Sequence, residues 1–261
     1  MSLIFSAVVP NSPLLIPSVG KDDLKYAKKT TDALGKLEEE LYAAKPQTII
    51  IISGHKRIFN TNFSINLTPE YSSNFKNFGN FSESKNYSCD LAMCHHVREA
   101  LEGKIPIKLY SEKELDYEIS VPLFYLTQNI TNFSIVPMSF SDLDTQSHFN
   151  FGQNLKDIIF ETTKRIAIIA AGDLSNNIGE KSNENTSKDV DKKIINYLKT
   201  KSIKKFIRTN PDSIFKAGAE NGYLSLLILL GIMDEINYSP ELLSYEFPFD
   251  VGMLTMNFKL N

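Results

Sequence analysis

The residues best suited to bind a ligand follow or begin the most apolar segments of this 261-residue chain. His55 comes directly after residues 48–54, which contain four consecutive isoleucines and end in Ser53 and Gly54. Glu220 stands just before the apolar residues 222–230, where the helix dipole would stabilise its carboxylate. Alternatively, His55 is a loop residue and Glu220 a helix-start residue, neither with a further role. Whether the two form one site depends on where the surrounding strands and helices place them.

The apolar segments before these residues predict an α/β fold. Residues 48–53 and 165–171 have no polar face, which is typical of parallel strands buried on both sides by helices. Further strands are expected at residues 4–9 and 133–139, and an amphipathic helix at residues 22–44 begins at Asp22 or Asp23. The strand–helix–strand order at residues 4–53 predicts a parallel pair. We expect one domain, residues 1–261, with a mainly parallel central sheet flanked by helices.

Ligands of open α/β sheets bind outside the carboxyl ends of the strands. We therefore expect these polar residues at one rim of the sheet: Asn11, His55, Ser139 or Ser141, and residues 173–176. Glu220 is the further candidate.

Three other segments give specific expectations. Residues 69–88 are polar, aromatic and irregular, which favours a loop or flap over the sheet edge. A helix is expected from Ser88 to Leu101, carrying both cysteines. A short apolar helix is expected at residues 121–126, with Pro122 near its first turn.

Composition limits the classes of function. The chain has 28 basic and 31 acidic residues and a net charge of −3, and no basic stripe suggests nucleic acid. No run of about 18 apolar residues is present, so no membrane partner is expected. The first residues lack the basic region of a signal peptide, and the two cysteines form no disulfide framework. We expect a soluble, cytoplasmic protein.

Several motifs, in a fixed order over nearly the whole chain, together resemble one family. The segments are Val9-Pro-Asn-Ser-Pro-Leu-Leu-Ile-Pro17, Ile52-Ser-Gly-His55, Leu115-Asp-Tyr117, Val121-Pro-Leu-Phe-Tyr-Leu126, Ala171-Gly-Asp-Leu-Ser-Asn176, Ala219-Glu-Asn-Gly222 and Pro240-Glu-Leu-Leu-Ser-Tyr-Glu246. The sequence resembles the class III extradiol ring-cleavage dioxygenases of the LigB-like and Memo-like type. Each motif alone is a weak signal, so the resemblance rests on the order and spacing of all the motifs.

The resemblance implies an Fe(II) site of two histidines and one carboxylate. These ligand positions fall on Asn11, His55 and Glu220. The family's acid/base histidine falls on Asn176, and a further active-site histidine falls on Tyr117. The cysteine of Memo-like members falls at Asn221.

The departures from the family pattern change the expected chemistry. A carboxamide at Asn11 is a weak metal donor, and Asn176 cannot exchange a proton near neutral pH. Tyr117, with an ordinary pKa of about 10, is mainly a hydrogen-bond donor, and His148 is an alternative acid/base. We interpret the chain as a family member with a degenerate metal site that cleaves no aromatic ring and binds a small-molecule ligand or a protein partner.

Two alternatives remain open. One is an active metal-dependent dioxygenase with altered ligands, acting on an unknown aromatic substrate. The other is a subunit whose partner supplies the missing residues, and a homo-oligomer would also be consistent. The expected cofactor is accordingly none, weakly bound Fe(II), or another divalent metal.

Two residue clusters offer rival sites. The cluster of Cys89, Cys94, His95 and His96 fits no common zinc spacing, so buried cysteines are the simpler interpretation. Four aromatic residues could line a pocket, but a packed flap is favoured: Tyr71, Phe75, Phe78 and Phe81.

Overall fold

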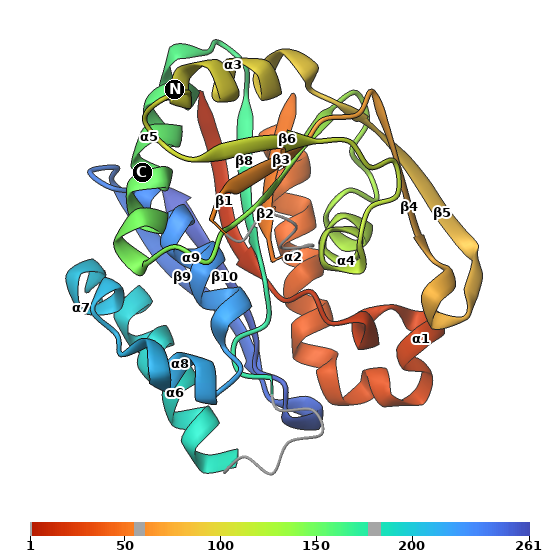
Figure 1. The fold of residues 1–261 in the computed structure, drawn as a ribbon. Helices are drawn as coiled ribbons and strands as arrows, with labels where there is room; N and C mark the ends of the chain where they lie inside the picture. The colour runs from red at the N-terminus through yellow and green to blue at the C-terminus, as the bar shows by residue number, and fades with distance from the viewer. Residues whose placement is uncertain (1, 55–60, 177–183) are drawn as a thin grey trace.

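The chain folds around one mixed β-sheet with helices on both faces (Figure 1). This computed structural model describes residues 2–54, 61–176 and 184–261. Across these residues the sheet has ten strands, in the order β4-β5-β7-β2-β8-β1-β10-β9, with β3 pairing with β7 and β6. The strands are β1 (Leu3–Val9), β2 (Thr48–Ser53), β3 (Phe63–Asn66), β4 (Glu70–Phe75), β5 (Asn80–Cys89), β6 (Ile107–Tyr110), β7 (Ser134–Ser139), β8 (Ile166–Ala171), β9 (Tyr238–Glu246) and β10 (Met253–Leu260).

The centre of the sheet is parallel, as the apolar segments predict. β5, β7, β2, β8 and β1 run parallel to their neighbours in this order, and β10, β9 and β4 are attached antiparallel. The helices are α1 (Pro17–Gly20), α2 (Lys28–Ala44), α3 (Leu91–Leu101), α4 (Tyr117–Leu126), α5 (Thr145–Glu161), α6 (Glu184–Lys199), α7 (Ile203–Ile207), α8 (Pro211–Lys216) and α9 (Glu220–Ile232). Among the described residues, no helix is both long and apolar enough to cross a membrane.

The isoleucines of β2 explain why the sheet is covered on both sides. All four are fully buried. Ile50 and Ile52 pack into the core formed with α3, α5 and α9. Ile49 and Ile51 pack into the core formed with α2 and α4. Because successive side chains of a strand point to opposite faces, an unbroken apolar run requires an apolar layer on each side.

The two strands that were expected to form a parallel pair, β1 and β2, are not neighbours in the sheet. β1 and β2 are parallel to each other, but β8 lies between them and pairs with both. The edge of the sheet also differs, because residues 69–88 form no irregular flap. They form the antiparallel hairpin of β4 and β5, which Figure 1 shows at one side of the molecule.

Three helix starts differ from the expectations. The segment before α2 is a 3-10 helix (Lys21–Ala27), and α2 begins at Lys28 rather than at an aspartate cap. α3 begins at Leu91, so Cys89 ends β5 instead of lying on the helix. α4 begins at Tyr117, which places Pro122 inside the helix.

Candidate ligand-binding site at the strand ends

A pocket of about 480 Å³ opens beyond the carboxyl ends of β1 and β8. Its volume lies within the usual range for small-molecule sites, about 300–1,000 Å³. The lining residues are Asn11, Tyr117, Glu118, Asp173, Asn176, Phe215, Lys216, Gly218, Glu220 and Asn221. Asn11, Tyr117, Asn176 and Glu220, which the sequence singled out, therefore line one pocket, and His55 lies outside the described residues. Ser139 and Ser141, also expected at this rim, are buried and do not line the pocket.

A reciprocal pair of hydrogen bonds joins Asn11 to Asp173 across the pocket floor. The backbone N–H of Asn11 donates to Asp173 Oδ1 at 3.1 Å, and the backbone N–H of Asp173 donates to Asn11 Oδ1 at 3.2 Å. The pair forms because β1 and β8 are adjacent parallel strands, with Val9 opposite Ala171. Neighbouring strand ends thus bring two residues 162 positions apart into contact.

The Asn11 amide has one atom left for a ligand. Asn11 is only 4% exposed, and its Nδ2 has no hydrogen-bond partner among the described residues. Turning the amide over would place its NH₂ against the N–H of Asp173, so the hydrogen bond fixes the oxygen toward the backbone. The available group is therefore a buried donor, which attracts a hydrogen-bond acceptor.

Asp173 is the residue in this pocket best suited to exchange a proton near neutral pH. Burial raises the pKa of its carboxyl to about 7, although backbone N–H groups of Asn11 and Ser12 act in the opposite direction. The nearby carboxylate of Asp191 raises the pKa further. A carboxyl with a pKa near 7 can both donate and accept a proton at neutral pH.

Two glycines let α9 approach the loop after β8. The backbone N–H of Gly222 donates to Asp173 O at 3.0 Å, and a Cβ at Gly222 would lie 2.4 Å from that oxygen. Gly218 has a positive φ of 62°, and a Cβ there would lie 2.1 Å from Asn176 O. Glu220 lies between these glycines, so their close contacts bring its helix start to the pocket.

Tyr117 enters the pocket from the first residue of α4. Asp116 caps this helix by accepting a hydrogen bond from the backbone N–H of Tyr117 at 2.7 Å. Burial raises the pKa of the Tyr117 phenol to about 12, and the carboxylates of Glu118, Asp116 and Asp173 add to the shift. The phenol therefore keeps its proton at neutral pH, and its hydroxyl is hydrogen-bonded to the side chain of Glu118.

A buried carboxylate on α6 holds the loop after β8 in place. Asp191 accepts hydrogen bonds from the backbone N–H and hydroxyl of Ser175, at 3.0 and 2.6 Å, and from the hydroxyl of Tyr245 at 2.8 Å. Burial raises the pKa of Asp191 despite these three bonds. The loop that carries Asp173 is thus fixed from both α6 and β9.

The end of β2 lies beside the same pocket. A Cβ on Gly54 would lie 2.8 Å from Oδ1 of Asn221, a pocket residue on α9. Sequence reasoning placed Asp173 at the rim within residues 173–176 and Asn221 at the position of the Memo-like cysteine, but it gave neither a chemical role and did not name Glu118. The strand-end rule was the signal that placed Asp173 at the rim, because it lies two residues after β8.

The rival clusters do not form comparable sites. His95 and His96 are exposed, and His96 Nε2 lies 3.4 Å from Glu161. The described parts of the chain contain no group of three His, Cys, Asp or Glu residues able to hold a metal ion. His148, an alternative acid/base in the sequence, is fully buried with its ring nitrogens near carbonyl oxygens of Asp144 and Ser141. It does not line the strand-end pocket.

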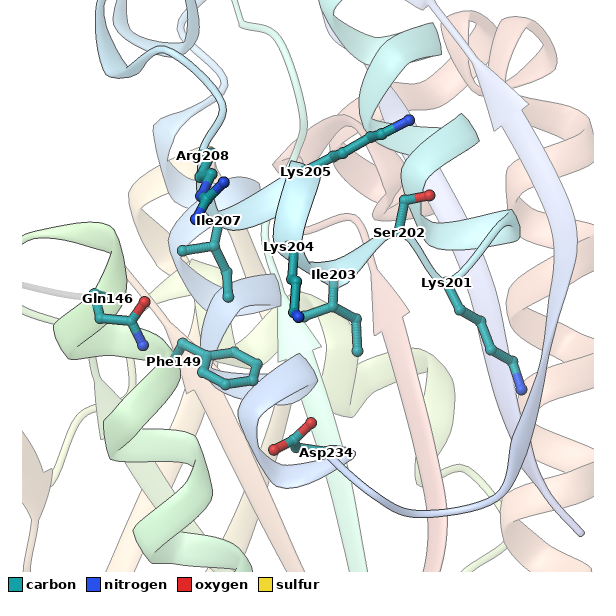
Figure 2. A pocket seen from close by; sticks show the side chains of 10 residues that line it. All are labelled: Gln146, Phe149, Lys201, Ser202, Ile203, Lys204, Lys205, Ile207, Arg208 and Asp234. Atoms are coloured by element: carbon teal, nitrogen blue, oxygen red, sulfur yellow. The ribbon is translucent and has the colours of Figure 1, made fainter.

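A larger cavity of about 770 Å³ lies between the starts of α5 and α7 and shares no lining residue with the strand-end pocket. Figure 2 shows Lys201 and Lys205 extending in different directions from its rim. Lys201 donates to the carbonyl oxygen of Tyr238 and covers that ring, and Gln153 donates to Asp234. Lys201 and Asp234 thus already have partners within the fold, and the strand-end pocket is the one lined by the residues that the sequence singled out.

Comparison with known proteins supplies the family. The family model for the catalytic LigB subunit of aromatic ring-opening dioxygenase matches residues 6–256. The chain belongs to the LigB family. Protein CA_C1420 of Clostridium acetobutylicum is 27% identical to this chain over an alignment of 265 positions, which covers 97% of this chain. The match covers 56% of the length of that relative.

The LigB fold is also seen in a solved structure. The uncharacterized protein JW3007 from Escherichia coli K12 superposes with a TM-score of 0.66, covering 98% of this chain and 99% of that chain. Its sequence is 18% identical, so this likeness concerns the fold. The predicted family and the predicted α/β fold are thus both confirmed.

Proposed function

We propose that this LigB-family protein binds a small polar molecule in the strand-end pocket and does not carry out iron-dependent ring cleavage. The observation that carries the proposal is the orientation of Asn11, whose Oδ1 accepts the Asp173 N–H and whose buried Nδ2 is left without a partner among the described residues. A buried donor without a partner is costly, by about 1–3 kcal/mol, and a ligand that accepts its hydrogen bond removes that cost.

The same orientation fits poorly with the Fe(II) that the family implies. An amide NH₂ carries no lone pair suited to a metal ion, and the amide oxygen is held by the backbone at 3.2 Å. Asn176, at the position of the acid/base histidine, has no titrating group. We therefore expect Fe(II) binding to be weak or absent.

The chemistry of the ligand follows from the groups in the pocket. Nδ2 of Asn11 supplies a donor without a partner among the described residues, and the Asp173 carboxyl supplies a proton that can be lost near pH 7. A molecule bearing carbonyl, carboxylate or hydroxyl oxygens complements these donors. The exposed ring of Phe215 offers an apolar contact at the rim.

One substitution separates donor chemistry from packing. Asn11→Asp keeps an oxygen for the Asp173 N–H but replaces the Nδ2 donor with an acceptor. We expect it to weaken binding of an oxygen-rich ligand by about tenfold or more. The matched control is Asn196→Asp, at an exposed position of α6.

The experiment is calorimetric titration with a panel of small carboxylic acids, amides and catechols, using protein whose fold is checked by circular dichroism. Binding that is lost in Asn11→Asp and kept in Asn196→Asp supports the proposal. Equal binding by both variants would show that the Asn11 donor does not contact the ligand.

The alternative function is a metal-dependent enzyme with altered ligands. Glu220 lines the pocket together with Asp173, and carboxylates suit hard divalent ions. This alternative predicts stoichiometric metal binding by the unmodified protein, whereas the main proposal does not.

A further inference from the structure

Two thiols meet at the opposite end of the sheet from the strand-end pocket. Cys89 is the last residue of β5 and pairs with Ile135, near the start of β7. Cys94 lies in the first turns of α3, which Figure 1 shows at the far end of the molecule from α8. Their Sγ atoms are 3.6 Å apart. The pair is independent of the pocket and of its proposed function.

The two sulfur atoms have unequal environments. The Cys94 thiol lies within hydrogen-bond distance of Cys89. The Tyr71 hydroxyl donates to the carbonyl oxygen of Asn66 at 2.6 Å and also lies 3.1 Å from Cys89 Sγ. The hydrogen bond from Cys94 lowers the pKa of Cys89 to about 7, burial opposes this, and Tyr71 contributes to the lowering. The hydrogen bond to Cys89, together with burial, raises the pKa of Cys94. The contacts thus favour the thiolate at Cys89 over the thiolate at Cys94, the order expected of a nucleophilic and a resolving cysteine.

The segment between the two cysteines is held firmly. Asp90 accepts a hydrogen bond from the Met93 N–H at 3.1 Å, from Thr48 at 2.5 Å and from Lys164 at 2.6 Å. Its backbone carbonyl also accepts the Cys94 N–H at 3.0 Å. The reduced fold thus keeps the thiols in contact. Cys89 is partly exposed and Cys94 is buried, so Cys89 is the first of the two that an oxidant from solvent would meet.

We propose that Cys89 and Cys94 are a reversible redox pair, which a peroxide oxidises to one intramolecular disulfide. The Cys89 thiolate attacks one peroxide oxygen, so that an S–O bond forms, the O–O bond breaks and the leaving oxygen takes a proton to become water or an alcohol. Cys94 Sγ then attacks the sulfenic sulfur, forming the S–S bond and releasing water as its own proton is lost. The two thiols lose two electrons and two protons in total, and the peroxide gains them.

Closing the bond needs only a small movement. The sulfur atoms must approach from 3.6 Å to about 2.0 Å. A dithiol reductant reverses the reaction by thiol–disulfide exchange. The bridge would join the end of β5 to α3.

The test is intact-mass analysis of the full chain after treatment with hydrogen peroxide at pH 7, followed by alkylation in denaturant. We expect a loss of about 2 Da, protection of both cysteines from alkylation, and full recovery with dithiothreitol. In Cys94→Ser, we expect a sulfenic acid at Cys89 that dimedone traps. In Tyr71→Phe, oxidation should slow several-fold at pH 7, because Cys89 loses one hydrogen bond to its thiolate.

Three results would overturn the proposal. They are two thiols that remain free in the wild type, oxidation of Cys89 to the sulfinic acid while Cys94 stays free, and disulfide-linked dimers. Each is read from the wild-type protein alone, so a variant that fails to fold does not obscure the outcome.

Discussion

Replacing Asp173 with Asn should change how the stability of this protein depends on pH. Burial raises the pKa of the native carboxyl to about 7 from an ordinary value of 3.8. In the unfolded chain the same group ionises near its ordinary value, so the native state binds more protons between these two pH values. The stabilising effect of protonated Asp173 is therefore complete below about pH 4 and is lost as pH rises through about 7.

The size of the effect follows from the shift. A difference of roughly three pKa units corresponds to about 4 kcal/mol, and the loss is about 1.4 kcal/mol for each pH unit within the window. Asn cannot ionise, but its carbonyl oxygen can still accept the Asn11 N–H that Asp173 accepts at 3.1 Å. Any loss of packing in Asp173→Asn is independent of pH. Relative to wild type, the variant should thus gain about 2–3 kcal/mol between pH 5 and pH 8.

The assay is urea unfolding followed by circular dichroism at pH 5, 6, 7 and 8, for wild type, Asp173→Asn and the control Asp157→Asn. Asp157 is exposed on α5, so its substitution should leave the wild-type pH dependence unchanged. A free-energy difference between wild type and Asp173→Asn that stays constant across this range would refute the assignment of a raised pKa to Asp173.

Two further substitutions test the framework of the site and of the redox pair. Gly222→Ala places a Cβ 2.4 Å from the Asp173 carbonyl oxygen and should destabilise the protein by about 1–3 kcal/mol. The control Gly35→Ala, with open space around it in α2, should be neutral or stabilising. Urea unfolding of both variants gives the comparison. Burial opposes ionisation of Asp90, but the hydrogen bonds from Lys164 and its other donors outweigh burial and hold the pKa of Asp90 below its ordinary value. Asp90→Ala should therefore cost about 1–3 kcal/mol at pH 7 and less as pH falls below about 4, and equal costs at pH 3 and pH 7 would contradict this.

The main features of the fold could be predicted because they depend on local patterns. Four consecutive isoleucines require two apolar layers, and all four are buried. The rule that ligands bind at the carboxyl ends of strands then predicts that polar side chains converge at one rim. Asn11 and Asn176 do line one pocket there. Glu220 begins α9 as its sequence position indicates.

Other features depend on contacts that no local pattern contains. The insertion of β8 between β1 and β2 is decided by pairing over more than a hundred residues. The β4–β5 hairpin was missed because two of its buried positions are polar, Ser73 and Asn80, which hides the alternation of strand residues. Asp173 was not assigned a role because its pKa depends on burial and on Asn11, which only the folded chain brings beside it.

Anaerobic Fe(II) titration of the purified wild-type protein, followed by a catechol-cleavage assay in air, tests the central claim most directly. We expect no stoichiometric Fe(II) binding and no ring cleavage by the wild type, because the Asn11 amide presents a donor rather than a ligand atom. Asn11→His should restore Fe(II) binding while turnover stays low, since Asn176 still lacks a titrating group. Stoichiometric Fe(II) binding with ring cleavage by the wild-type protein would contradict the account.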